Sequence, residues 1–369
     1  MRKIVTKQQD LNLNDYDISL LTSDSLILDI ETTGLSPLNA FIYLIGFTYL
    51  DEEHVTSVQL FAESAEDEIL ILYSFLEYLT EETVLVSFNG NRFDIPFLQK
   101  RMDFYSISYT LYSHDTFDLY KVASSIAPLL HLQNKKQKTL ELFLGIGRED
   151  LYHGRELIQV YFDFLEHKNE MLASLLLLHN FEDITGLLQL LPLLRFRSLF
   201  YTDPVQITCH KRSYKKWNDD EYSEELLIHA EYPYDFPRPV MYRNQHFYIK
   251  AENHSVNIMV YLIKDTLYHF YPDYKNYEFL IQEGYAIHKS ISQFLSKDVK
   301  QKASAENCYT KKTGVFLPCF SKSELPIFHK AYKDKVTYIE FDDSMILDAE
   351  FITTLFLDLR NQVKKSLKI

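Results

Sequence analysis

An apolar run that ends in two acidic residues constrains this chain most strongly. Residues 26–35 read LILDIETTGL, in which Asp29 and Glu31 are separated by one residue. Because side chains alternate along a strand, both carboxylates would lie on the same face of one strand. Neighbouring carboxylates repel each other unless a cation neutralises them, so the pair predicts a metal site that a turn at Gly34 would leave accessible. An exposed strand end also accounts for such a pair.

Two later segments carry further acids in apolar surroundings. Residues 84–98, VLVSFNGNRFDIPFL, predict a buried strand and then a helix that begins near Asp94. Residues 175–194, LLLLHNFEDITGLLQLLPLL, place His179 and Asp183 four positions apart, on one face of a helix. Simpler explanations stay open, since an aspartate before a helix is usually an N-cap and a histidine among apolar residues is usually a core side chain.

In this order and spacing, the segments DIETTGL, NGNRFD and HNFED resemble the three motifs of the DEDD superfamily of 3′-to-5′ exonucleases, whose catalytic domain has the ribonuclease H-like fold. Over about residues 20–195 the chain is similar to bacterial YprB-like ribonuclease H-like proteins. The resemblance implies a set of metal-binding acids: Asp29, Glu31, Asp94 and Asp183. Residues beside these acids in the first two motifs are candidate nucleic-acid contacts: Thr32, Gly34, Leu35, Asn89 and Phe93.

His179 is the candidate catalytic residue, as a general base. The family's third motif carries a tyrosine four residues before its last aspartate or a histidine five before it, whereas here a histidine stands four before Asp183. The chain thus combines the spacing of one branch with the residue type of the other. A histidine, with a reference pKa of about 6.5, suits receiving a proton from the attacking water near neutral pH.

The acids also fit the chemistry of phosphodiester hydrolysis. A pair of divalent cations about 3.5–4 Å apart activates the nucleophile and stabilises charge on the attacking and leaving oxygens. Carboxylate oxygens favour Mg²⁺ or Mn²⁺, so we expect two such ions. The cysteines have neither zinc-type spacing nor an even number, which predicts a reducing, cytoplasmic setting: Cys209, Cys308 and Cys319. Residues 1–15 contain no apolar signal core and the longest apolar stretches fall short of a ~20-residue span, so no membrane partner is expected.

Charge is distributed unevenly along the chain, whose formal net charge is -14. Residues 1–194 hold 13 Lys+Arg and 29 Asp+Glu, whereas residues 195–369 hold 25 and 23. Residues 289–338 contain ten lysines and four acids, with aromatic residues interleaved. Lysines and aromatic rings together can hold a phosphate backbone and stack bases, which makes Lys311 and Lys312 candidate nucleic-acid contacts. A solvated surface over an ordinary aromatic core is the alternative.

The predicted fold class is α/β, with a ribonuclease H-like mixed sheet flanked by helices over residues 1–196 and a smaller α+β domain over residues 197–369. Strands in the first domain are expected at 26–30, 42–49, 55–61 and 84–88. Helices are expected there at 66–79, 97–104, 139–144, 154–166 and 170–194. Pro192 marks the end of the last of these helices. The family resemblance adds a late strand at 113–120, whose acids Asp115 and Asp118 we expect to be structural.

The sequence of the second domain predicts short strands and two helices. The strands are expected at 225–231, 246–250, 255–263 and 337–341, and the helices near 286–295 and 350–367. The run YPYDFPRPV, residues 232–240, predicts an extended loop or edge because proline cannot donate to a sheet ladder.

These features predict a metal-dependent 3′-to-5′ exonuclease that hydrolyses DNA or RNA at a single-stranded 3′ end. The alternative is a nucleic-acid-binding or assembly protein that keeps the fold without efficient catalysis, which the acidic first domain and the spacing of His179 favour. No P-loop or G-x-S-x-G pattern is present, so the sequence gives no support to an NTPase or a serine hydrolase.

Overall fold

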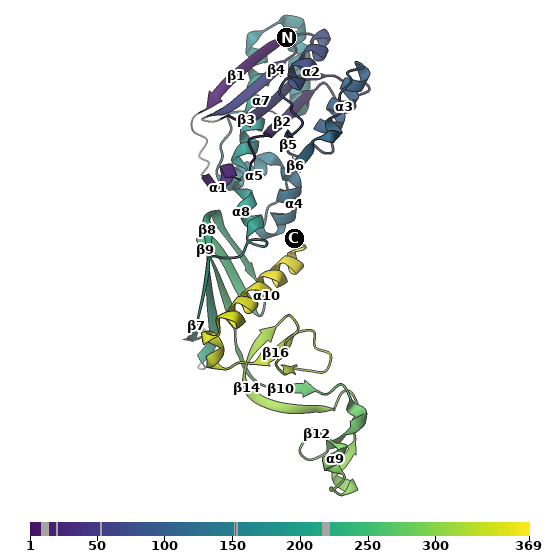
Figure 1. The fold of residues 1–369 in the computed structure, drawn as a ribbon, viewed down its shortest axis with the longest axis vertical. Helices are drawn as coiled ribbons and strands as arrows, with labels where there is room; N and C mark the ends of the chain where they lie inside the picture. The colour runs from purple at the N-terminus through teal and green to yellow at the C-terminus, as the bar shows by residue number, and fades with distance from the viewer. Residues whose placement is uncertain (9–14, 20, 52–53, 151, 153, 216–221) are drawn as a thin grey trace. The chain divides into compact units, whose positions relative to one another are not determined.

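The structure is a computed structural model that describes residues 1–8, 15–19, 21–51, 54–150, 152, 154–215 and 222–369. It contains two compact units, Met1–Leu199 and Phe200–Ile369 (Figure 1). The sequence places the boundary at residue 196. Each unit buries its own apolar side chains, including the clusters with Leu28 and with Ile27 in the first unit and the cluster with Phe316 in the second.

A six-stranded mixed sheet forms the centre of the first unit, in the order β1-β4-β3-β2-β5-β6 (Figure 1). The strands are β1 (Arg2–Gln8), β2 (Ser25–Thr32), β3 (Ile42–Leu50), β4 (Val55–Phe61), β5 (Val84–Ser87) and β6 (Asp115–Asp118). The first four in the sheet order pair antiparallel, whereas β2, β5 and β6 pair parallel. With helices on the sheet, this confirms the predicted fold class.

Strand β2 lies in the interior of the sheet and is covered on both faces. Leu28 and Ile30 join the large core cluster that includes side chains of the helices α2 (Glu68–Leu76) and α3 (Asp94–Phe104). Ile27 belongs to a second cluster with α4 (Leu119–Leu130) and the end of α7 (Glu170–Gln189). Asp29 and Glu31 follow Ile27 at alternate positions, so they share its face.

The remaining helical elements of the first unit are α1 (Asp15–Ser19), η1 (Ala65–Asp67), η2 (Leu111–Ser113), α5 (Gln137–Leu144), α6 (Gly154–His167) and α8 (Leu193–Ser198), with η denoting 3₁₀ helices. The helix predicted at 66–79 is divided between η1 and α2, and the one at 170–194 is divided between α7 and α8, around Pro192. Strand β1 and helix α4 were not predicted. β1 is an edge strand whose residues alternate between half-buried and exposed, so it has no apolar signature.

The helical stretch 170–198 corrects one expectation. Among the described residues it is the one stretch long and apolar enough to cross a membrane, with mean hydropathy 1.2, so the prediction that all apolar stretches fall short was wrong here. Half of that apolar window is buried, and α7 packs against β2, β3 and β4, as expected for the core helix of a folded domain. Residues 9–14 of the N-terminal segment, where no signal core is predicted, lie outside the described part of the chain.

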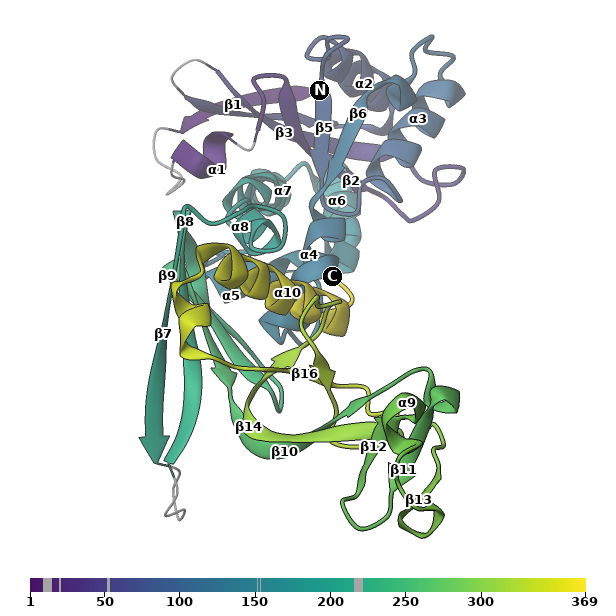
Figure 2. The same cartoon turned by 60° about the horizontal axis from the view of Figure 1, so that its bottom comes forward.

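The second unit is rich in strands, which form three sheets in the orders β7-β8-β9, β10-β14-β16-β15 and β12-β11-β13. The strands are β7 (Gln206–Lys215), β8 (Tyr222–Arg243), β9 (Phe247–Tyr261), β10 (Ile263–Phe270), β11 (Tyr277–Leu280), β12 (Tyr285–His288), β13 (Lys300–Lys302), β14 (Tyr309–Cys319), β15 (Ile327–Phe328) and β16 (Thr337–Glu340). The helical elements are η3 (Tyr274–Asn276), α9 (Lys289–Ser292), η4 (Lys297–Val299), η5 (Asp343–Leu347) and α10 (Ala349–Leu367). Figure 2 shows α9 beside the small sheet of β11, β12 and β13.

Several predictions for this unit need correction. The helix predicted at 286–295 was wrong at both ends, because residues 286–288 belong to β12 and the short α9 ends at Ser292. The run 232–240 belongs to strand β8, but β7 pairs with β8 only over residues 222–231, so this run has the edge position that was one of its two predicted alternatives. Its pairing with β9 shifts register around Phe236, which accommodates the prolines. Strand β9 replaces two predicted short strands, whereas the helix predicted at 350–367 is confirmed as α10.

Candidate metal centre

Three elements bring the predicted acids together. Strand β2 carries Asp29 and Glu31, helix α3 begins at Asp94, and helix α7 carries His179 and Asp183. Because β2 and β5 are parallel neighbours, their carboxyl ends lie at the same edge of the sheet. The turn after β5 therefore lies beside the end of β2.

The turn between β5 and α3 depends on a glycine. A Cβ on Gly90 would lie 2.3 Å from Ser87 Oγ and 3.0 Å from Asp94 Oδ2, so only glycine fits here without displacing Ser87. The preceding residue, Asn89, has a positive φ of 67°, a conformation that asparagine tolerates better than most residues. The NG pair of the second motif therefore sets the position of Asp94.

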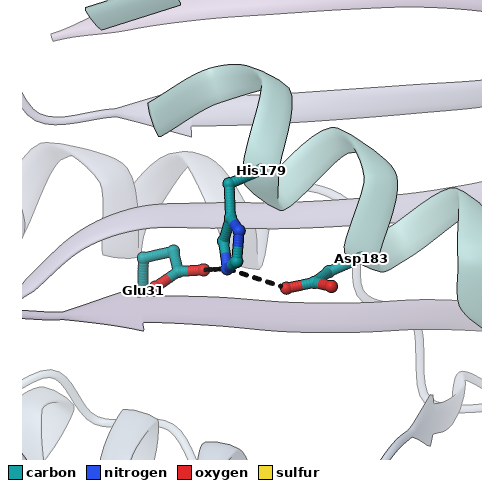
Figure 3. Close-up of side chains that lie close together, drawn as sticks. All are labelled: Glu31, His179 and Asp183. Atoms are coloured by element: carbon teal, nitrogen blue, oxygen red, sulfur yellow. Dashed lines mark ion pairs between the residues drawn. The ribbon is translucent and has the colours of Figure 1, made fainter. Parts of the chain in front are cut away.

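His179 lies between two of the acids (Figure 3). Its Nε2 is 3.3 Å from Glu31 Oε1 and 3.2 Å from Asp183 Oδ2. These three residues each offer a ligand atom, and the ligand atoms lie within 4.8 Å of one another. The histidine is buried but does not serve only to fill the core, because its ring nitrogen faces two carboxylates.

The electrostatics of β2 show how close the carboxylates lie. The pKa of the Asp29 carboxyl is raised well above its ordinary value, first by burial and then by its acidic neighbours Asp183, Glu31 and Asp94. The pKa of Glu31 is raised in the same way by burial, Asp183 and Asp94. A cation beside Asp29 and Glu31 would oppose both effects and favour their ionised forms.

Asp94 is the first residue of α3, and the N-cap of this helix is Phe93. Burial, followed by the charges of Asp118 and Asp183, raises the pKa of Asp94 to about 7, although hydrogen bonds from its own amide and that of Ile30 oppose this. The bond from Ile30 places this carboxylate beside β2. The alternative explanation of Asp94 as a cap is therefore wrong.

Asp118 has a structural contact with the same turn. Its Oδ1 accepts hydrogen bonds from the amides of Tyr120, at 3.0 Å, and of Asn89, at 2.8 Å, so it caps α4 and fixes the turn after β5. Asp115 is exposed. The contacts of Asp118 agree with the structural role expected for it, whereas the role expected for Asp115 stays a prediction.

Sequence reasoning missed Asn180, which holds Asp29. Its Nδ2 donates to Asp29 Oδ2 at 3.0 Å, and its Oδ1 accepts from Gln59 Nε2 at 2.9 Å. The Asn180 side chain occupies the space beside Gly46, where a Cβ would lie only 2.0 Å from Asn180 Oδ1. An isolated glycine within the apolar strand IYLIGFTYL was a signal of this close approach.

Sequence reasoning also missed Asp150, whose buried side chain lies behind His179. Its Oδ2 is 2.6 Å from His179 Nδ1 and 2.9 Å from Lys138 Nζ, and its Oδ1 accepts from the Tyr152 amide at 2.9 Å. Burial alone would raise the pKa of Asp150, but the bonds from Lys138, Tyr152 and His179 hold it below the ordinary value. Asp150 is therefore an ionised carboxylate that can only accept hydrogen bonds.

Arg148 balances charge at the other side of Asp183. Its Nη1 is 2.5 Å from Asp183 Oδ1, and its Nη2 donates to Glu141 Oε1 at 2.6 Å. Glu141 is buried against Gly186, where a Cβ would lie 2.2 Å from Glu141 Oε1. One face of Asp183 is thus neutralised by an arginine while the other faces His179.

The candidate nucleic-acid contacts of the first unit differ in exposure. Leu35 is 78% exposed on the loop after β2, and Leu38 on the same loop is 81% exposed. Thr32 is buried and donates to the Gly34 carbonyl at 2.8 Å. Phe93 packs against Phe97, with ring centroids 5.5 Å apart. Of these residues, Leu35 and Leu38 present the largest apolar surface to a ligand.

The candidate lysines of the second unit lie on β14. Lys312 Nζ is 2.6 Å from Glu340 Oε2, and Lys311 Nζ lies 6.0 Å from the centre of the Tyr309 ring. Phe316 and Phe328 of the same basic stretch are buried in a core cluster. For these two rings the alternative of an ordinary aromatic core was correct.

Comparisons with known proteins agree with the fold of the first unit. Residues 26–195 match the model of the RNase H superfamily, so this part of the chain is a ribonuclease H-like domain. No curated protein matches the chain.

Solved structures similar to the chain include nucleic-acid enzymes. The family B DNA polymerase from the hyperthermophilic archaeon Pyrobaculum calidifontis is 14% identical, with 68% of this chain and 35% of that chain covered and a TM-score of 0.36. Escherichia coli exonuclease I in complex with a dA16 oligonucleotide is 14% identical, with 57% and 55% covered and a TM-score of 0.30. The chain spans about a third to about half of these proteins, and such scores are too low to assign a function.

Proposed function

We propose that this protein is a metal-dependent nuclease, specifically a 3′-to-5′ exonuclease that hydrolyses phosphodiester bonds in single-stranded DNA or RNA. The observation that carries the proposal is the cluster of largely buried acids, in which Glu31 and Asp183 flank the Nε2 of His179 and the charges of Asp29 and Asp94 act on the same group. Repulsion within this cluster is a cost to the folded protein that a bound cation would remove.

The donor set suits hard divalent cations. The four carboxylates offer oxygen ligands, which Mg²⁺ and Mn²⁺ prefer, and we propose that they hold two such ions. The chemistry that bound ions supply is stabilisation of charge on the attacking and leaving oxygens of the phosphodiester. The raised pKa values of Asp29 and Glu31 support this assignment, because a cation restores the ionised forms.

The chain's own residues have separate roles in this proposal. Nε2 of His179 accepts the proton of the attacking water, and Asn180 keeps the Asp29 carboxylate in place. Leu35 and Leu38 offer apolar surface to a base of the substrate. In the second unit, Lys311 and Lys312 add affinity for the phosphate backbone.

A labelled-strand assay tests the reaction and its polarity. Single strands of DNA and of RNA, labelled at the 5′ or the 3′ end, are incubated with the full chain and Mg²⁺ or Mn²⁺, with and without EDTA. We expect early release of the 3′ label and a shortening ladder of 5′-labelled products, both abolished by EDTA. Early release of the 5′ label, or a single internal cut, would contradict the polarity.

A binding or assembly protein without efficient catalysis is the second candidate. The net charge of -16 that follows from 13 Lys+Arg and 29 Asp+Glu in residues 1–194 favours it, because a polyanion is repelled by this domain. The same assay separates the candidates: a gel shift of the intact strand with no cleavage in either cation would support the binding protein.

A further inference from the structure

Residues 148–150, which precede α6, each form an ion pair or a hydrogen bond with helix α7. Arg148 contacts Asp183 at 2.5 Å, and the amides of Glu149 and Asp150 donate to the Glu182 carboxylate at 2.7 and 3.0 Å. Asp150 then accepts from His179, with 2.6 Å between Oδ2 and Nδ1. Residues 148–150, here called the strap, therefore follow one side of α7 and reach both of its functional side chains.

Asp150 is held at several points within the strap. The Asp150 side chain is 2% exposed, and both of its carboxylate oxygens have hydrogen-bond partners. Lys138 and His179 contact Oδ2, and the Tyr152 amide donates to Oδ1. Backbone bonds to Glu182 fix the main chain at the same residue. A carboxylate held at this many points can determine the orientation of the imidazole that it contacts.

The two ring nitrogens of His179 have opposite requirements. A neutral imidazole carries one proton, and the acidic oxygens of Glu31 and Asp183 beside Nε2 would draw that proton to Nε2. A proton on Nε2 would leave no lone pair there to accept another. Asp150 offers only acceptor oxygens to Nδ1 and so favours the proton at Nδ1.

We infer that Asp150 is a positioning residue, which fixes the His179 ring with Nδ1–H toward the strap and the Nε2 lone pair toward Glu31 and Asp183. The consequence for catalysis rests on the proposed function, in which Nε2 accepts a proton. Asp150 does not touch the reacting atoms. It acts through His179, and Lys138 and Glu182 keep Asp150 in place.

Nitrogen NMR of the metal-free protein tests the ring directly. In full-length chain labelled with ¹⁵N-histidine, the signals that disappear in His179→Ala identify His179. We expect a long-range ¹H–¹⁵N spectrum of the wild type to show Nδ1 protonated and Nε2 unprotonated. In Asp150→Asn the amide can turn its NH₂ toward Nδ1, so a form protonated at Nε2 should appear. If the wild-type spectrum shows an unprotonated Nδ1, that result alone overturns the inference, before any variant is measured.

Kinetics separate positioning from a merely structural role. Asp150→Asn should lower kcat by about 10–100-fold, as loss of an outer partner of a site histidine typically does, and change KM little. In the His179→Ala background the same change should have no further effect on kcat. Asp163→Asn, a matched change on the outer surface of α6, should leave the spectrum and kcat unchanged.

The outcomes distinguish this inference from the proposed function. If the spectra behave as expected and the wild type releases no nucleotides, the positioning of His179 stands and the nuclease proposal fails. If the wild type is active and Asp150→Asn keeps the wild-type spectrum and kcat, the inference fails alone. A further decrease of kcat from Asp150→Asn in the His179→Ala background would also contradict it.

Discussion

The acidic cluster of the first unit and the lysines of the second unit hold charge in opposite ways. Asp94 is buried and Asp29 and Glu31 are half-buried, and desolvation and neighbouring like charges raise the pKa values of all three. Lys312 is exposed and already paired with Glu340 at 2.6 Å. Buried like charges destabilise the fold unless a ligand neutralises them, whereas an exposed pair needs no ligand. The structure therefore points to the acids as a binding site more strongly than to the lysines.

The largest expected effect is that of Asp29→Asn. The amide keeps the shape and can still bond to Asn180, but it loses the charge that holds a cation. A metal ion contributes several kcal/mol to transition-state stabilisation, so nucleotide release should fall by roughly 10³-fold or more. Release from end-labelled strands measures this, with Asp163→Asn as control. Wild-type activity of Asp29→Asn would mean that the acidic cluster is no more important for cleavage than the lysines of the second unit.

Replacing His179 should cost less. His179→Ala removes the proton acceptor beside Glu31 and Asp183 but leaves the carboxylates, and general-base help is typically worth about 10²–10⁴-fold. The rate at saturating strand concentration measures the loss. A rate as low as that of Asp29→Asn would mean that His179 also holds the ion, and an unchanged rate would exclude it as the base.

The pH dependence of stability sharpens the contrast further. Since the pKa of Asp94 is raised to about 7 in the folded protein, its contribution to stability is present at low pH and is lost as pH rises through that value. The free energy of unfolding of the metal-free protein should therefore fall by a few kcal/mol between pH 5 and pH 8. Mg²⁺ should restore stability more at pH 8 than at pH 5.

Denaturant unfolding with and without Mg²⁺ checks this expectation. Asp94→Asn should reduce the pH dependence, because one of the carboxyls with a raised pKa is gone. A metal-free protein that is equally stable at both pH values would show that the acids do not repel one another as their positions indicate.

The smallest effect is expected from the lysines. Replacing Lys311 and Lys312 by alanine should weaken binding to single strands and lower the salt slope by about 0.7 for each phosphate that is no longer neutralised. Because Lys312 is paired with Glu340, Lys311→Ala alone should account for most of the change. Fluorescence anisotropy over a range of salt concentrations measures the affinity and the salt slope. The control replaces Lys135 and Lys136, two consecutive exposed lysines of the first unit, by alanine. Equal effects of both pairs would mean that only total charge matters.

The sequence predicts those parts of the molecule that local patterns determine. Strand β2 and its acids follow from an apolar run with alternating carboxylates, and α7 follows from its length. Asp150 was missed because it lies 29 residues from His179 and meets it only through tertiary packing. Edge strand β1 has no apolar pattern, and β12 was assigned to a helix because a four-residue strand is too short to show alternation.

Calorimetric titration of the metal-free chain with Mn²⁺ tests the central claim most directly. The claim is that Asp29, Glu31, Asp94 and Asp183 form one site for divalent cations. We predict saturable binding of about two ions per chain, as a two-metal site requires, and its loss or marked weakening in Asp29→Asn. Absence of binding to the wild type at millimolar Mn²⁺, or equal binding by Asp29→Asn, would contradict the claim.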